Sequence, residues 1–383
     1  MPLETQVSAV TLAPSQGVDI GRIEKELASM WSGAGDAGDQ AAHAGVTRAC
    51  TLNLVVYTTP ADDGDKLEEL LEEVNERHPG RTLILVADRD AAQARIEAYV
   101  SMRCRLLGAT GRQICGEQVT IEAGGALVET AATAVAPLLV PDVPVFLWWK
   151  DVPHYEDKLF DRLAQMADRV VIDSAAFNHP HADLLRLAQM IGQRSPRMRV
   201  SDINWGRLNS WRTLLASFWD VPDYRPMLGA IDRLTISYRP PAAAPGEIAA
   251  SALLLAGWLA SRLDFEVDGA SLRAGDGIEC RVRKGARTVA LALLPEKSGD
   301  GAAGSISSVA GSTEGGAMTF VVTLRDGGTK LTTEARIGTI RTVGRVIGHP
   351  LRSDADRLCG ELAFLSRDAV YEEALARAAQ LVG

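Results

Sequence analysis

The sequence lacks the common signatures of enzyme chemistry. It contains no Gly-x-x-x-x-Gly-Lys-Ser/Thr, no Gly-x-Gly-x-x-Gly that opens a helix after a strand, no His-Glu-x-x-His and no Gly-x-Ser-x-Gly. These motifs mark nucleotide, dinucleotide, zinc and acyl-transfer sites, so none of these kinds of site is indicated. We therefore expect no bound cofactor and no catalytic centre built on any of these motifs.

Metal ligands are also scarce. The chain has six histidines, and only His179 and His181, separated by a proline, form a close pair. Because no third ligand is suggested nearby, a solvated loop explains this pair better than a metal site. The sequence thus predicts no metal.

Cysteine is sparse, with five residues at positions 50, 104, 115, 280 and 359 and no CxxC spacing. This pattern fits neither a disulfide framework nor a zinc site, so we expect most of the thiols to be reduced and packed as small hydrophobic groups. Cys104 and Cys115 are symmetric about the turn at 108–111, and a regular hairpin would place them opposite each other. Reduced, packed thiols and an oxidisable regulatory pair both remain open for these two positions.

Positive charge is in deficit. The chain has 40 Lys and Arg against 49 Asp and Glu, a net charge of −9 and a pI of about 5.3, which argues against a nucleic-acid partner. No stretch reaches the roughly 18 uncharged apolar residues that cross a bilayer, and residues 1–15 lack a basic flank before an apolar run. We expect a cytoplasmic protein with no membrane partner.

The overall composition is that of a folded globular chain, with 46% hydrophobic and 23% charged residues. A length of 383 residues exceeds what one hydrophobic core usually serves, so we expect two domains. A helix at 19–31 and a stretch rich in Gly, Ala and Asp at 32–45, which predicts a mobile linker, come first. We place the N-terminal arm, helix and linker at 1–45, the first domain at 46–225 and the second at 226–383.

Hydrophobic patterning predicts that the first domain is α/β. Extended and helical runs alternate along it, with strands expected at 51–58, 82–87, 145–149, 169–173 and 199–203 and helices at 66–77, 158–166 and 182–191. Segments 96–107 and 113–122 flank a glycine-bounded turn, which predicts an antiparallel hairpin. The expected fold is a mixed, largely parallel sheet with flanking helices.

The second domain is predicted to be α+β, with an antiparallel sheet and C-terminal helices. Its expected elements are a strand at 234–238, a helix at 246–262 and extended runs at 278–283, 288–294, 319–324 and 330–337. Residues 298–316, rich in Gly, Ser and Ala, have the composition of an exposed flexible loop. Two helices between 354 and 382, separated near 366–368, complete the domain.

Polar side chains follow two of the predicted parallel strands. Asp151 follows the apolar run at 145–149, and Asp173 and Ser174 stand at the end of the predicted strand at 169–173. Ligands and partners of parallel sheets are usually held beyond the carboxyl ends of the strands. We take Asp151, Asp173 and Ser174 as a candidate polar cluster.

The segment after the next strand is rich in tryptophan and arginine. These side chains are common anchors of protein interfaces because they combine a large apolar area with polar groups. Core packing is the alternative for the tryptophans. The candidate partner-binding residues are Asn204, Trp205, Arg207, Trp211, Arg212 and Trp219.

These segments carry a resemblance to a known family. The runs VPVFLWW at 143–149, RVVIDSAAF at 169–177, DINWGRLNSWRTLLASFWD at 202–220 and SDADRLCGELAFLSRDAVYEEAL at 353–375 resemble the OpcA family of glucose-6-phosphate dehydrogenase assembly proteins. The resemblance implies a non-catalytic, two-domain protein that binds the oligomeric dehydrogenase. It also implies that the protein promotes the active oligomer at the entry to the oxidative pentose phosphate pathway. Such an allosteric activator must bind the active state of its partner more tightly than the inactive state.

An enzyme remains the alternative. A lactonase or isomerase that binds a sugar phosphate would use the same strand-end region, with Asp173 and Arg207 as its polar groups. Such an enzyme would bind or convert a sugar phosphate alone, whereas an assembly factor would act only when the dehydrogenase is present.

Overall fold

The computed structural model describes most of the chain. The described residues are 6–10, 18–39, 46–48, 50–107, 112–154, 156–193, 198–267, 272–274, 277–342 and 344–382. Two compact units contain them: Met1–Ile172, Arg194–Val200 and Ser353–Ser366 form the first, and Asp173–Gln193, Ser201–Arg352 and Arg367–Gly383 form the second. Each unit therefore combines separate stretches of chain, and the boundary expected between residues 225 and 226 falls inside the second unit.

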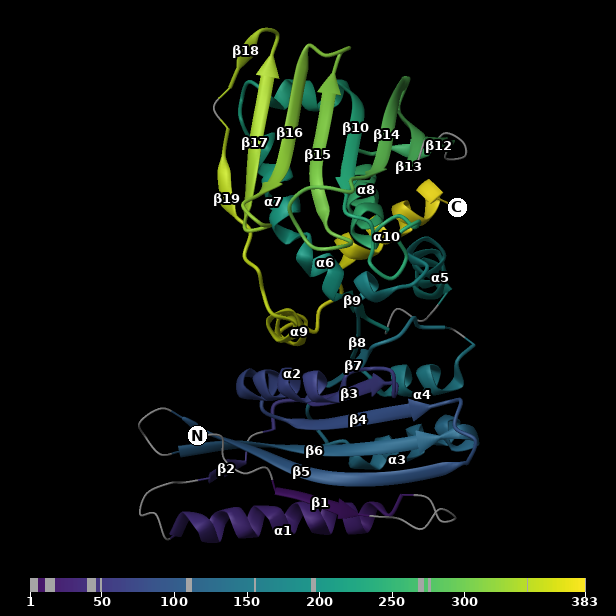
Figure 1. The fold of residues 1–383 in the computed structure, drawn as a ribbon, viewed down its shortest axis with the longest axis vertical. Coiled ribbons are helices and arrows are strands. Elements are labelled where there is room, and N and C mark those ends of the chain that lie inside the picture. The colour runs from purple at the N-terminus through teal and green to yellow at the C-terminus, as the bar shows by residue number, and fades with distance from the viewer. Residues whose placement is uncertain are drawn as a thin grey trace. The chain divides into compact units, whose positions relative to one another are not determined.

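The first sheet has nine strands in the order β1-β5-β6-β4-β3-β7-β8-β9, with β2 beside β6 (Figure 1). Its strands are β1 (Gln6–Val10), β2 (Val46–Arg48), β3 (Asn53–Thr58), β4 (Arg81–Asp88), β5 (Arg95–Leu107), β6 (Arg112–Gly124), β7 (Val145–Trp149), β8 (Arg169–Ile172) and β9 (Val200–Asp202). Neighbours from β6 to β8 pair in parallel, whereas β1 and β5 pair antiparallel. The predicted mixed, largely parallel sheet and its hairpin are confirmed.

The order of the parallel strands is that of a doubly wound fold. The chain starts at β3, moves outward through β4 to β6, and then returns to the other side of β3 to form β7 and β8. The strand order therefore reverses between β3 and β7, and ligands of such sheets bind in the crevice at this switch point.

Amphipathic helices accompany the first sheet. They are α1 (Ile20–Asp39), α2 (Gly64–Arg77), α3 (Ala132–Val135), α4 (Lys158–Met166) and α9 (Asp354–Leu362), with the short 3-10 helices η2 (Gly125–Thr130) and η3 (Ala136–Leu138). Leu67, Leu71 and Val74 form the buried stripe of α2. Helix α1 continues eight residues beyond the predicted end at Trp31 and into the stretch expected as a linker, whose last residues, 40–45, lie outside the described chain.

A buried ion-pair network connects α1 to the sheet. Arg81 is only 3% exposed, and its guanidinium lies 2.6 Å from the Glu117 carboxylate and 2.5 Å from that of Glu24. The same guanidinium donates to the Leu138 carbonyl over 2.7 Å, and the Trp31 indole donates to Glu117 over 2.5 Å. Because charges buried with several hydrogen-bond partners are costly to separate, this network fixes where the helix lies.

The second sheet has ten strands in the order β11-β13-β14-β10-β15-β16-β17-β18, with β12 beside β13 and β19 beside β17. Its strands are β10 (Ile231–Tyr238), β11 (Glu266–Val267), β12 (Leu272–Ala274), β13 (Gly277–Lys284), β14 (Arg287–Pro295), β15 (Ile306–Thr313), β16 (Met318–Arg325), β17 (Lys330–Ile337), β18 (Ile340–Arg341) and β19 (Val346–Gly348). Apart from the parallel pair β10–β14, the pairs are antiparallel. The predicted antiparallel character of this part is confirmed.

Helices pack against one face of the second sheet (Figure 1). The helices of this unit are α5 (Pro180–Gln193), α6 (Ile203–Arg207), α7 (Asn209–Phe218), α8 (Ala250–Arg262) and α10 (Ala369–Val382), with η4 (Ser174–Ala176) and η5 (Arg225–Ala230). Helix α8 is buried along almost its whole length. A Cβ on its Gly257 would lie 2.0 Å from the Ala374 carbonyl oxygen, so only glycine lets α10 approach this closely.

One sequence prediction for this unit is wrong. Residues 306–313 form β15 in the middle of the sheet, although the stretch 298–316 was expected to be a flexible loop. The small residues of β15 are required by packing, because a Cβ on Gly311 would lie 2.5 Å from the Phe320 ring. A composition that is typical of loops therefore occurs here in a strand, where close packing leaves little room for larger side chains.

The predicted pair of C-terminal helices is confirmed, and the break between them has a structural role. Ser353 begins α9 with a capping box, and α9 belongs to the first unit whereas α10 belongs to the second. Buried Arg169 holds the end of α9 by donating to the carbonyl oxygens of Phe364 and Ser366 over 3.1 and 2.7 Å. Within the described ranges, no helix has both the length and the apolar character to span a bilayer.

Candidate functional site

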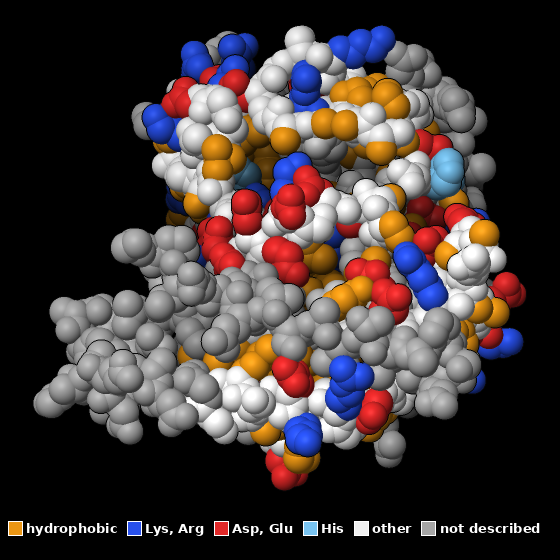
Figure 2. Space-filling view, turned by 60° about the horizontal axis from the view of Figure 1, so that its bottom comes forward, with side chains coloured by type: hydrophobic (Ala, Val, Ile, Leu, Met, Phe, Trp, Pro, Cys, Tyr) orange, Lys and Arg blue, Asp and Glu red, His pale blue; other side chains and the backbone are white. Residues whose placement is uncertain are grey.

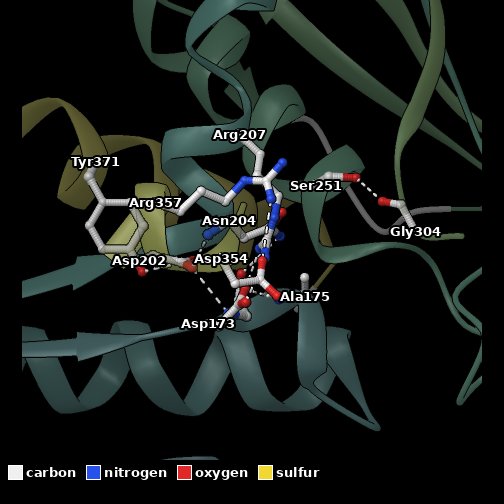
Figure 3. A network of polar contacts seen from close by, with 11 residues as sticks. Asp173, Ala175, Asp202, Asn204, Arg207, Ser251, Gly304, Asp354, Arg357 and Tyr371 are labelled. Atoms are coloured by element: carbon white, nitrogen blue, oxygen red, sulfur yellow. Dashed lines mark hydrogen bonds and ion pairs between the residues drawn. The ribbon is translucent and has the colours of Figure 1, made fainter. Parts of the chain in front are cut away.

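A buried polar cluster lies at the start of α6, in the second unit (Figure 3). Asp202, the N-cap of α6, is 1% exposed, and one carboxylate oxygen accepts from the backbone N–H groups of Ser174 and Asn204 over 3.0 and 2.9 Å. The Asn204 side-chain amide donates to the Ser174 hydroxyl over 3.0 Å. The Tyr371 hydroxyl donates to the other oxygen of Asp202 over 3.4 Å. The cluster therefore joins η4, α6 and α10.

The electrostatics of this cluster are dominated by burial. Removal from water, and then the nearby negative charge of Asp173, raise the pKa of Asp202 to about 7. Hydrogen bonds from the Ser174 side chain, and then from the backbone N–H groups of Ser174 and Asn204, oppose this rise in the pKa only in part. A carboxyl with such a pKa exists in both protonation states near neutral pH, which is a property shared by functional sites and by buried structural networks.

Arg207 and Asp173 form the outer part of the cluster. Two guanidinium nitrogens of Arg207 lie 2.5 and 2.8 Å from the two carboxylate oxygens of Asp173, and both side chains are about three-quarters buried. A bidentate pair of this kind fixes the orientation of both groups. Each charge is matched by its partner, so neither group is left free to bind a phosphate.

The structure buries the two central tryptophans of the candidate partner-binding segment. Trp205 and Trp211 are 4% and 2% exposed, and the Trp205 indole donates to Asp368 over 2.9 Å. The guanidinium of Arg212 lies 3.4 Å from the centre of the Trp205 ring, an arrangement that combines stacking with cation–π attraction. These contacts favour the core alternative for both tryptophans.

The remaining residues of that segment are placed differently. Asn204 is buried in the polar cluster, whereas Trp219 is half-buried and packs against Phe218 and Phe320 with ring centroids 5.1 and 5.3 Å apart. Trp219 and Arg212 therefore retain some accessible surface. The assignment of the whole segment to a partner surface stays a prediction.

Only two residues of the candidate polar cluster come together with the groups described above. Asp173 and Ser174 lie in the second unit, next to Asp202. Asp151 belongs to the first unit, is exposed and accepts from the backbone N–H of its neighbour Val152 over 2.7 Å. Sequence reasoning missed Asp202 and Tyr371, although an aspartate directly before a helix is a recognisable capping signal for the first of them.

The switch point of the first sheet has its own charged groups. Asp63 caps the N-terminus of α2, and Asp62 accepts from Thr58 Oγ1 over 2.6 Å and from Lys150 Nζ over 2.9 Å. Although burial acts in the opposite direction, these bonds hold the pKa of Asp62 below its usual value. Doubly wound sheets bind pyrophosphate at this position, on a helix N-terminus. Both carboxylates are paired with lysines there, Asp62 with Lys150 and Asp63 with Lys66, so these lysines are not left to attract the phosphates of a dinucleotide.

The space beside this switch point is filled by aromatic side chains. Trp149 stacks on Tyr57 with ring centroids 3.6 Å apart and meets the edge of Phe160 at 4.9 Å. Arg89 pairs with Asp157 over 2.5 Å nearby. Within the described residues, no group of three or more His, Cys, Asp or Glu side chains is arranged to hold a metal ion.

Charged side chains of both signs are interspersed on the face drawn in Figure 2, with carboxylates gathered near its centre. This distribution agrees with the net charge of −9. A surface of this kind offers no extended basic track on that face for a phosphate backbone.

The pairing register bears on the two candidate redox cysteines. The β5–β6 register continues from Arg95 opposite Gly124 to Leu107 opposite Arg112, and it places Cys104 directly opposite Cys115. Cys115 is buried and disulfide-bonded, whereas Cys50, Cys280 and Cys359 are free. The bonded form of Cys115 differs from the reduced thiol that a reducing compartment would favour. A regulatory role for the pair stays a prediction.

Comparison with known proteins places the chain in a family. Residues 71–189 and residues 198–375 match two family models, described as the N-terminal and the C-terminal domain of a "Glucose-6-phosphate dehydrogenase subunit". A structure of myo-inositol dehydrogenase from Lactobacillus casei covers 86% of this chain and 93% of its own at 11% identity, with a TM-score of 0.39. A score this low carries no inference about function.

Curated relatives give the same family. "Putative OxPP cycle protein OpcA" of Nostoc punctiforme is 29% identical over an alignment of 346 positions that covers 72% of each chain. The proteins of the same name from Synechocystis sp. and Synechococcus elongatus are 34% and 37% identical over 178 and 172 residues, and these matches span only 35% and 37% of the relatives' own lengths. The two domain models together cover most of both units. The chain belongs to the OpcA family.

Proposed function

We propose that the chain is a non-catalytic subunit that binds glucose-6-phosphate dehydrogenase and promotes its active oligomer. The observation that supports this most directly is the match of two successive dehydrogenase-subunit domain models over residues 71–189 and 198–375. The names of the relatives connect the family to the oxidative pentose phosphate cycle. The protein acts there as an allosteric activator in the cytoplasm and needs no cofactor.

The geometry of the strand ends agrees with a role outside catalysis. Arg207 is paired with Asp173, and the hydrogen-bonding groups of Ser174 and Asn204 are used within the buried cluster. At the switch point, Asp62 and Lys150 neutralise each other. A sugar-phosphate enzyme built on Asp173 and Arg207 has less support, because the Arg207 guanidinium that would bind the phosphate is already paired with the Asp173 carboxylate.

Activation requires a difference in affinity between two states of the dehydrogenase. If the activator bound both states equally tightly, it would change neither the oligomer nor the kinetics. A differential binding free energy of about 1–3 kcal/mol changes the apparent substrate affinity about 5- to 150-fold. An effect within this range is the expected signature.

The test is to mix the purified chain with its cognate glucose-6-phosphate dehydrogenase, and to record mass by light scattering and the KM for glucose 6-phosphate. We expect a complex of defined mass and a lower KM. The chain alone, incubated with glucose 6-phosphate or 6-phosphogluconolactone, is the control for the enzyme alternative. Turnover by the chain alone, or the absence of any complex, would refute the proposal.

A further inference from the structure

One face of the second sheet is open. Along β10, Leu234 and Ile236 are buried on the helix-covered face, whereas the alternate residues Arg233, Thr235 and Ser237 are exposed or half-buried. The same alternation continues in β16 and β17. Because directly paired residues point to the same face, the register arranges the open-face side chains in rows that cross the strands.

One of these rows is rich in arginine. Its members, paired in succession from β13 to β17, are Arg281, Ala290, Arg233, Ser312, Thr319 and Arg336. The three arginines are exposed. With strands about 4.8 Å apart, Arg281 and Arg233 are separated by about 10 Å, and Arg233 and Arg336 by about 14 Å.

These three arginines have no ion-pair or hydrogen-bond partner within the part of the chain that the structure describes. The neighbouring Arg341 differs, because its guanidinium lies 2.6 Å from the Glu334 carboxylate. Asp232 lies next to Arg233 and interacts with its charge without forming an ion pair, while its carboxylate accepts from the Ser312 hydroxyl over 2.7 Å. Unpaired cations in one row are unexpected on a chain with a net charge of −9.

The row beside the arginine row has small side chains in its middle and a carboxylate at each end. The next row, again from β13 to β17, consists of Glu279, Ala292, Thr235, Ala310, Val321 and Glu334. A groove of about 310 Å³ lies between the two rows at the β16–β17 end, with Thr319, Val321, Glu334 and Arg336 among its lining residues. A partner can therefore approach the middle of the sheet closely, where its carboxylates reach Arg233 between Ala290 and Ser312, away from the two ends that carry Glu279 and Glu334.

We propose that this open face binds a surface of the dehydrogenase that carries carboxylate side chains, through Arg233, Arg281 and Arg336. The proposal rests on the proposed function, because it names the contact surface for the same partner. A second copy of this chain fits less well. In a face-to-face pair with the two arginine rows in opposition, like charges would cost free energy, and only a shifted pair would bring Glu279 and Glu334 of one copy against the arginines of the other.

The test is the double charge reversal Arg233→Glu/Arg336→Glu, mixed with the cognate dehydrogenase. We expect the variant to bind at least about tenfold more weakly than the wild type. Charges of opposite sign on two partners raise both the rate of association and the affinity of the complex. The affinity of the wild type should fall as salt rises, and that of the variant should fall less steeply. Both side chains are exposed, so thermal unfolding of the variant should match that of the wild type.

The matched control is Lys66→Glu/Lys158→Glu, which makes the same change in net charge on the first unit, at side chains 80% and 70% exposed. Thr319→Trp fills the groove without any change of charge and should also weaken binding. Equal binding by the wild type and the arginine variant, or equal losses in the arginine and lysine variants, would overturn this surface. So would a self-association of the wild-type chain alone that the arginine variant lacks. A wild-type chain that fails to bind the dehydrogenase would instead refute the proposed function.

Discussion

The Tyr371 hydroxyl donates a hydrogen bond to the Asp202 carboxylate over 3.4 Å, between residues 169 positions apart in the sequence. Both side chains are buried, and Asp202 forms no ion pair with a cation within the described residues. Its charge is balanced only by hydrogen bonds, and burial raises its pKa to about 7. This hydrogen bond between α10 and α6 thus involves a carboxyl group that changes its protonation state near neutral pH.

The first prediction concerns Asp202→Asn, which keeps the shape of the side chain and removes its charge. The folded protein holds the proton of Asp202 with a pKa of about 7, against about 4 in the unfolded chain. This contribution to stability is therefore complete below about pH 4 and is lost as the pH rises through 7. The free energy of unfolding of the variant, relative to wild type, should increase by about 2–3 kcal/mol between pH 5 and pH 8.

Urea unfolding of both proteins across this pH range measures the difference. Tyr371→Phe serves as the control, because it removes the hydroxyl but keeps the carboxyl group, and its stability should retain most of the wild-type dependence on pH. Parallel curves for the wild type and Asp202→Asn would show that Asp202 does not titrate in this range.

The second prediction concerns the buried network at Arg81. Arg81→Met leaves the Glu117 carboxylate, which is 6% exposed, without its main partner. Breaking one side of a buried ion pair usually lowers the free energy of unfolding by about 3–5 kcal/mol. Urea unfolding should show this loss, together with weaker protection of α1 from hydrogen exchange, since Glu24 on α1 also binds Arg81.

The double variant Arg81→Met/Glu117→Leu provides the control for this network. Replacing both charges by apolar groups of similar size removes the unpaired carboxylate, so most of the lost stability should return. A single variant as stable as wild type would mean that water reaches Glu117.

The fold was largely predictable because the spacing of hydrophobic residues shows which faces of a helix or strand are buried. Segments such as 145–149 and 170–172 are apolar on both faces, as expected for parallel strands covered by helices, and they lie in β7 and β8. Residues 306–313 were missed because their Ser, Gly and Ala side chains give no hydrophobic signal. Their position as β15 depends on Phe320, which packs over Gly311 from the next strand.

The candidate site was harder to predict because it depends on residues far apart in the chain. Asp173 and Ser174 were found from their place after a strand, but Tyr371 comes from a helix almost 200 residues later. The exposed fraction of a side chain could also not be predicted from its residue type. Trp211 and Arg212 are neighbours in the sequence, yet Trp211 is 2% exposed and Arg212 is only half-buried.

The third prediction separates core packing from partner binding in this segment. Trp211→Ala should lower the free energy of unfolding by about 3–5 kcal/mol, as removal of a large buried side chain leaves a cavity. Arg212→Ala should cost much less, since it removes mainly the contact with the Trp205 ring. Binding of the dehydrogenase by the folded Arg212→Ala variant then tests the surface. Weaker binding supports a partner contact, and unchanged binding removes Arg212 from the interface.

The last prediction concerns Cys115, which is disulfide-bonded and lies opposite Cys104 in the register. Titration of the denatured, unreduced protein should find three free thiols, those of Cys50, Cys280 and Cys359, and five after reduction. Cys104→Ser tests the residue opposite Cys115 as its bonding partner, and it should expose one thiol more than the unreduced wild type. Cys50→Ser, the control, should expose one fewer.

Activation of the dehydrogenase by the wild type, measured before and after mild reduction, then decides between the two roles of the pair. A change in activation that disappears in Cys104→Ser identifies a regulatory pair, and unchanged activation identifies a structural one. Five free thiols in protein purified without reductant would contradict the bonded form, and would favour the reduced, packed thiols that a reducing compartment predicts.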